Sequence, residues 1–88
     1  MHGLTVTIPA TLGLLTELTG LDLHGNSFTG HVPDALAQLT QLQGLWLNHN
    51  DHLTGTIPTS LCELTSWTVG IWVDCELIEC ACDVCECA

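Results

Sequence analysis

The 88-residue chain contains no lysine and no arginine, and against ten aspartate and glutamate residues this gives a formal net charge of −10. A phosphate backbone or an anionic lipid surface would therefore repel the protein rather than attract it. The sequence also has no run of 18 apolar residues and no recognisable signal peptide. These absences exclude nucleic acid as a partner and predict no direct membrane insertion by this segment.

A chain of this size has room for only a small core, so a stabilising device is expected. Cysteine is the obvious candidate, because six are present in a short chain, which is typical of an oxidising compartment. They are Cys62, Cys75, Cys80, Cys82, Cys85 and Cys87.

Most of the remaining sequence is a repeat of 24 to 25 residues. The segment FTGHVP at 28–33 returns as LTGTIP at 53–58, and a weaker copy, LTVTIP, stands at 4–9. Between these segments, the pattern L-x-x-L-x-L-x-x-N occurs at 18–26 and again at 42–50. About two and a half copies of one template thus account for nearly every large aliphatic residue.

Leucines two positions apart predict a short strand with one buried side. Leu21 and Leu23 point one way, as do Leu45 and Leu47, while the residues beside them point the other way. Asparagines 26 and 50 follow the strands, where their amides can bond to the backbone of neighbouring coils. The outward positions of these two strands are Asp22, His24, Trp46 and Asn48.

The template L-x-x-L-x-L-x-x-N-x-L identifies a leucine-rich repeat, in which each unit forms a short strand and returns through a turn or short helix. With its L-T-G-x-I-P segments, the region 2–73 resembles the plant-type class found in extracellular parts of receptor-like kinases and in polygalacturonase inhibitors. The resemblance implies an α/β solenoid with short parallel strands. It also implies a concave face that binds ligands.

A third strand is expected within 67–73, and two registers are open. With one inserted residue, Ile71 and Val73 take the core positions and Trp72 joins the concave face. Without it, Gly70 and Trp72 would face the core. The first register completes the predicted ligand-binding set, which is Asp22, His24, Trp46, Asn48 and Trp72.

The tryptophans of that set have a second interpretation, in which Trp46 is an ordinary variable-face residue and Trp72 packs under the cap. Trp67 aligns with Leu42 and is predicted to lie in the core. The repeat scatters the five histidines among concave strand, convex segment and loop, so we interpret them as solvated residues rather than as metal ligands.

The ends of the chain differ from the middle. His2 aligns with Asn26, so the chain opens within a repeat, and we interpret it as the C-terminal fragment of a longer array or a truncated gene model. Residues 1–73 are assigned to the repeats and 74–88 to a cysteine-rich cap. Cys62, the segment 73–75 and Cys80-x-Cys82 resemble the ends of leucine-rich-repeat proteins from diatoms. Capped extracellular relatives imply an extracellular or secretory location for the parent protein.

The cysteine tail itself allows three interpretations. Its spacing, Cys-x-Cys-x-x-Cys-x-Cys, suits a soft metal such as Zn²⁺, but Glu79, Asp83 and Glu86 would make that site strongly anionic and weaken metal binding at neutral pH. Disulfides would each contribute roughly 2–4 kcal/mol. We therefore predict structural disulfides and no metal, with a reduced, disordered tail as the third alternative.

The sequence gives little support for an enzymatic function. Ser27, Ser60 and Ser66 lie outside the predicted strand positions, and no nucleophile motif or glycine-rich phosphate loop occurs. We predict a non-enzymatic recognition module without a cofactor, which binds a protein, peptide or glycan. The alternatives are a purely structural end of a longer array, or a metal-binding cysteine tail.

Overall fold

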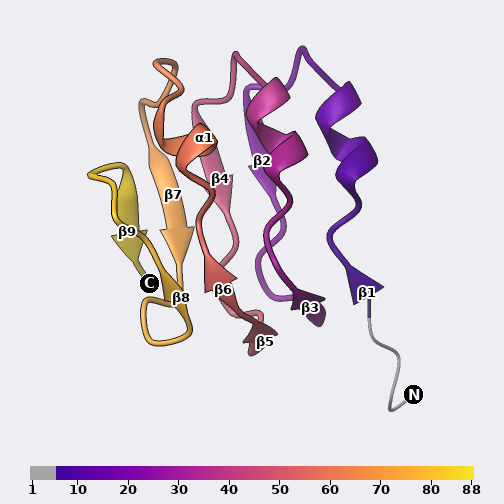
Figure 1. Cartoon of the computed structure of the whole chain (residues 1–88), viewed down its shortest axis with the longest axis vertical. Helices are drawn as coiled ribbons and strands as arrows, with labels where there is room; N and C mark the ends of the chain where they lie inside the picture. The colour runs from indigo at the N-terminus through magenta and orange to yellow at the C-terminus, as the bar shows by residue number, and fades with distance from the viewer. Residues whose placement is uncertain (1–5) are drawn as a thin grey trace.

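A computed structural model describes residues 6–88, which stack as successive coils with short parallel strands on one side and short helices on the other (Figure 1). The predicted α/β solenoid is therefore confirmed. His2 and the start of the first repeat lie outside the described residues.

All regular elements are short. In chain order they are β1 (Val6–Thr7), η1 (Ala10–Leu14), β2 (Gly20–Asp22), β3 (Phe28–Gly30), η2 (Asp34–Gln38), β4 (Gly44–Trp46), β5 (His52–Leu53), β6 (Gly55–Thr56), α1 (Thr59–Cys62), β7 (Gly70–Val73), β8 (Ile78–Glu79) and β9 (Cys85–Cys87). The η elements are 3₁₀ helices. The strands form three parallel sheets, of which the largest has the order β2-β4-β7-β9.

The register of this four-stranded sheet decides the orientation of the third strand. Leu45 of β4 lies opposite Ile71 of β7, and Trp46 lies opposite Trp72. The register with one inserted residue is therefore confirmed, and the register that buries Trp72 is wrong. Ile71 and Val73 are fully buried beneath the sheet, which is why this register is preferred.

One hydrophobic core runs between the strands and the helices. The fully buried aliphatic residues are Leu36, Leu39, Leu42, Leu45, Leu47, Leu53, Leu61, Ile71 and Val73. Each contributes about 1.5–3 kcal/mol through the apolar surface it removes from water. In the first coil Leu15, the equivalent of Leu39, is 52% exposed, and Leu14 beside it is 71% exposed, because no described coil covers that side of η1.

Proline and glycine shape the side opposite the four-stranded sheet. Pro9, Pro33 and Pro58 each directly precede a helix with extended backbone, and proline suits this place because it has no N–H to lose and a fixed φ. Gly55, in the second copy of the L-T-G segment, has φ of +97°, which a side chain would strain. The repeated L-T-G-x-I-P segment thus turns the chain from strand into helix.

Asn50 joins two coils through its side chain. It is only 1% exposed, donates to the carbonyl oxygens of Leu23 at 3.0 Å and Leu47 at 2.9 Å, and accepts from the Phe28 N–H at 3.3 Å. The equivalent Asn26 is exposed and donates only within its own turn, to Leu23 and His24. Among residues 6–88, the predicted role of these amides is realised between coils at Asn50 and not at Asn26.

The cysteine-rich tail, residues 74–88, forms a further coil of the solenoid. β8 pairs with β6, and β9 adds a fourth strand beside β7 (Figure 1). The sequence did not predict these strands, because only 14 positions separate Ile71 from its partner Cys85, far below the repeat length. Short as it is, this last coil covers the outer edge of β7.

Candidate ligand-binding face

Four side chains lie in one line across the face of the four-stranded sheet that points away from the core. The register places Asp22 of β2 opposite Trp46 of β4, and Trp46 opposite Trp72 of β7. Trp72 in turn lies opposite Glu86 of β9. The two acids are exposed and the two tryptophans are half-buried. We call these four residues the concave row.

Glycine makes room for the first tryptophan. A Cβ atom on Gly44 would lie 2.7 Å from Cη2 and 3.0 Å from Cζ3 of the Trp46 indole, too close for carbon atoms. A Cβ atom on Gly20 would lie 3.7 Å from Cζ3, an ordinary contact. The indole therefore rests against the strand backbone at positions where glycine leaves space for it.

Asp22 is held by His24, which lies two residues further along, just after the end of β2. Its Oδ1 pairs with Nδ1 of His24 and also accepts from the His24 backbone N–H at 3.1 Å. The hydrogen bond from the His24 side chain, followed by that from its backbone, lowers the pKa of the Asp22 carboxyl below its ordinary value of 3.8. The carboxylate at this end of the concave row is thus charged at neutral pH.

Asn48 and Asp74 occupy the equivalent positions beside the other two strands. Each lies two residues after a tryptophan of the row and just beyond the end of its strand, β4 or β7. The Oδ1 atom of Asn48 is buried and has no hydrogen-bond partner among the described residues. Asp74 is already engaged, since its Oδ2 accepts from the backbone N–H of His49 at 2.8 Å and of Asn50 at 3.4 Å. Asp74 therefore fixes the turn after β4.

The structure brings three of the five predicted ligand-binding residues into the concave row, namely Asp22, Trp46 and Trp72. His24 contacts Asp22, and Asn48 follows Trp46 at the next outward position. Sequence reasoning missed Glu86. The sequence feature that could have indicated Glu86 is the alternation Cys85-Glu86-Cys87, which has the period of two typical of a strand. It falls inside a segment that does not match the repeat.

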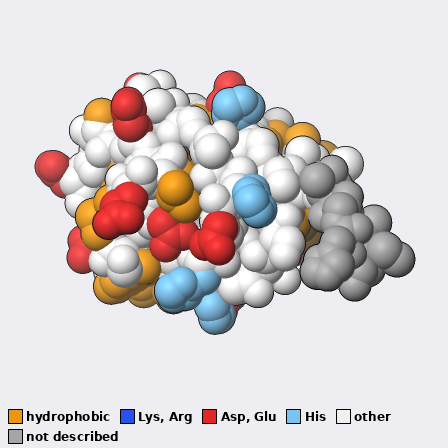
Figure 2. Space-filling model, turned by 90° about the horizontal axis from the view of Figure 1, so that it is seen from below, with side chains coloured by type: hydrophobic (Ala, Val, Ile, Leu, Met, Phe, Trp, Pro, Cys, Tyr) orange, Lys and Arg blue, Asp and Glu red, His pale blue; other side chains and the backbone are white. Residues whose placement is uncertain are grey.

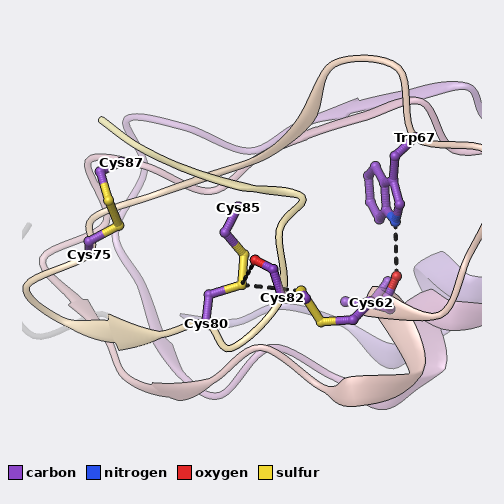
Figure 3. Close-up of a disulfide and its surroundings, with 8 residues drawn as sticks. Cys62, Trp67, Cys75, Cys80, Cys82, Cys85 and Cys87 are labelled. Carbon is purple, nitrogen blue, oxygen red and sulfur yellow. Dashed lines mark hydrogen bonds between the residues drawn. A yellow bond between two sulfur atoms is a disulfide. The ribbon is translucent and has the colours of Figure 1, made fainter.

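All six cysteines are paired. Cys62 of α1 is joined to Cys82, with Cα atoms 5.8 Å apart, Cys75 to Cys87 and Cys80 to Cys85 (Figure 3). The sulfurs of Cys62, Cys80 and Cys82 lie within 4.8 Å of one another, close enough for a metal. They are engaged in disulfide bonds, however, and disulfide sulfurs offer no thiolate to a metal ion.

Trp67 supports the start of this cap. It is half-buried against the core, and its Nε1–H donates to the Leu61 carbonyl at 2.9 Å, beside Cys62 (Figure 3). The preceding Ser66 hydroxyl donates to the carbonyl of Leu42 at 2.6 Å. Trp67 therefore packs against the edge of the core rather than lying fully within it as predicted, and Ser66 joins two coils.

Negative charge is spread beyond the concave row. Figure 2 shows the edge of the solenoid at which β4 and β7 end, where acidic side chains and histidines gather. A hollow beside the Cys75–Cys87 disulfide is lined by Asp51, Asp74 and Glu76. With no lysine or arginine in the chain, no permanent cation within the protein offsets these carboxylates.

Among residues 6–88, no helix has the length and apolar character needed to cross a membrane. The longest of them has five residues.

Comparison with known proteins agrees with this geometry. The Leucine Rich Repeat family matches residues 17–39 and 41–64. Receptor-like protein 41 of Arabidopsis thaliana is 47% identical over 52 residues, and receptor-like protein 39 of the same plant is 45% identical over 52 residues. Each alignment covers 59% of this chain but only 6% of the relative. The chain thus spans a small part of the length of these curated relatives.

Proposed function

This chain belongs to the leucine-rich repeat family, and we propose that it is a non-catalytic recognition module whose concave row binds a protein, peptide or glycan. The observation that carries the proposal is the pairing of Trp46 with Trp72 on neighbouring strands. Tryptophan combines a large rigid contact area with an N–H donor, and it is enriched among the residues that dominate binding energy.

Other features support the same face. The two acids at the ends of the row, Asp22 and Glu86, are exposed and can contact a ligand. Ser66 is committed to a hydrogen bond within the fold and lies off this face. The side chains that surround the tryptophans therefore suit binding rather than nucleophilic chemistry.

We also propose that the parent protein is extracellular or passes through the secretory pathway. Three disulfides in a small domain are typical of an oxidising compartment. The names of the Arabidopsis relatives describe them as receptor-like, which agrees with such a location.

A purely structural role is the second candidate, and the tail favours it. β9 covers the edge of β7 and is tied down by two disulfides, as expected of residues that close one end of a longer array. In that case the concave row would be incidental, and ligand binding would belong to other repeats.

Selection from a displayed random-peptide library, together with a glycan array, separates the two functions. Ligands retained by the unmodified chain are re-measured with Trp46→Ala, Trp46→Phe and Leu77→Ala. Leu77 is 40% exposed and lies outside the sheet, so it is a matched control for loss of exposed apolar surface. We expect Trp46→Ala to weaken binding at least about tenfold, Trp46→Phe to weaken it less, and Leu77→Ala to leave it unchanged.

Urea unfolding of each variant shows whether the fold has survived. Recognition by the concave row is refuted if folded Trp46→Ala binds every selected ligand as well as the unmodified chain, or if neither the library nor the array yields a ligand. The structural role would then be the better account.

A further inference from the structure

The two tryptophans of the concave row stand between carboxylates. Reading across the sheet, the order is acid, indole, indole, acid, from Asp22 to Glu86. Both acids are exposed, and among residues 6–88 the one basic side chain in contact with either of them is His24, which pairs with Asp22. A ligand that spans the row therefore meets negative charge at both ends.

The indole faces favour the same sign of ligand charge. The face of tryptophan attracts the guanidinium of arginine or the ammonium of lysine, more strongly than the face of tyrosine or phenylalanine does. Because the Trp46 ring rests against the backbone at Gly44, a ligand approaches it from the sheet's outer side. Carboxylates placed beside such rings add attraction that a neutral ligand cannot use.

The length of the row matches an extended peptide. Neighbouring strands are about 4.8 Å apart, so the three steps from Asp22 to Glu86 span roughly 14 Å. Four residues of extended chain cover about 13–14 Å, and alternate side chains of such a peptide point to the same side. Residues i and i+4 of a crossing peptide would thus reach the two acids, and residue i+2 would lie above the tryptophans.

Resting on the proposed function of the concave row, we propose that its ligand is an extended segment of a protein or peptide that carries arginine or lysine at two positions four residues apart. Asp22 and Glu86 each receive one basic side chain, while Trp46 and Trp72 contact the segment between them. The net charge of −10 adds long-range attraction for such a partner and repulsion of acidic ones.

Three synthetic heptapeptides test the inference by isothermal titration. The first has arginine at its second and sixth positions in a glycine and serine background. The second replaces both arginines by citrulline, which keeps the shape and removes the charge. The third places the two arginines side by side. We expect the first to bind at least about tenfold more tightly than the second and measurably more tightly than the third.

Charge-removing variants show where the peptide sits. Asp22→Asn and Glu86→Gln should each weaken binding of the first peptide by about threefold to tenfold. Glu63→Gln is the matched control: it changes the net charge equally, and Glu63 is exposed at the end of α1, away from the row. It should change binding less than about twofold, and raising NaCl from about 0.05 M to about 0.5 M should weaken binding.

Equal binding of the citrulline peptide, or an equal effect of Glu63→Gln and Glu86→Gln, overturns the inference. If the library described above yields neutral ligands that depend on Trp46, the recognition function stands and this ligand class falls. If no ligand of any charge depends on Trp46, both the recognition function of the concave row and the basic ligand class are refuted.

Discussion

Replacing Asn50 by alanine tests how the coils are joined. The substitution removes the two shorter hydrogen bonds that Asn50 donates, to the carbonyls of Leu23 and Leu47, and a longer one to the Asn48 carbonyl at 3.4 Å. It also removes the bond accepted from the N–H of Phe28. A buried backbone group left without a partner costs about 1–3 kcal/mol. Since Leu23 and Phe28 are half-buried and water can partly replace their bonds, we expect a loss of about 3 kcal/mol in the free energy of unfolding.

The assay is equilibrium unfolding in urea, followed by tryptophan fluorescence under non-reducing conditions. A chain of this size has an m-value near 1–1.5 kcal/mol per M, so the midpoint should fall by roughly 2–3 M with an unchanged slope. Asn26→Ala is the matched control, because the Asn26 side chain is exposed and, within the described part of the chain, bonds only to Leu23 and His24 in its own turn. Water can replace those bonds, and the expected loss is below about 1 kcal/mol.

A third variant separates hydrogen bonding from volume. Asn50→Asp keeps the acceptor for the Phe28 N–H but turns the two donated bonds into contacts between oxygen atoms, so it should destabilise the fold at least as much as Asn50→Ala. The reasoning is refuted if Asn26→Ala and Asn50→Ala lower the midpoint equally, or if Asn50→Asp is as stable as the unmodified chain.

Three further outcomes are expected. Reducing all disulfides should lower the free energy of unfolding by roughly 2–3 kcal/mol per bridge and unfold the tail. The urea midpoint should fall and the near-ultraviolet circular dichroism should decrease, whereas an unchanged midpoint would contradict a stabilising role. Gly44→Ala should displace the Trp46 indole and shift its fluorescence emission to longer wavelength, whereas Gly20→Ala should not, and an identical spectrum for Gly44→Ala would refute the packing described. Carbon NMR should show that the pKa of the Asp22 carboxyl lies below 3.8 and that it rises toward 3.8 in His24→Ala. The stability that the charged carboxylate adds is present above the ordinary pKa and is lost as the pH falls through the lowered pKa. An unchanged pKa in His24→Ala would contradict the assignment of the shift to His24.

Most of the repeat fold could be predicted because its determinants are local and repeated. Leu45 and Leu47 alternate with Trp46, and Ile71 and Val73 alternate with Trp72, so the same period of two assigns both strands to one sheet. The predicted place of Asp22 in the concave row follows from the same alternation.

The remainder depends on long-range pairing, which the repeat does not encode. Nothing near Cys82 shows that it bonds to Cys62 rather than to another cysteine, since six cysteines allow fifteen pairings. Likewise, Glu86 joins the concave row only because β9 lies beside β7, and that contact depends on how the tail folds back. The difference between Asn26 and Asn50 also arises from their neighbours in space, not from their place in the repeat.

The bridge from Cys62 to Cys82 gives the molecule two mechanical parts. If the ends are pulled apart, tension runs along the backbone to Cys62 and crosses the disulfide to Cys82, so residues 63–81 carry no load. Trp46 lies on the loaded part, whereas β7 with Trp72 lies on the shielded part. Force would therefore separate β4 from β7 and divide the tryptophan pair, so any ligand held by both would be released by tension while residues 63–81 remain unextended.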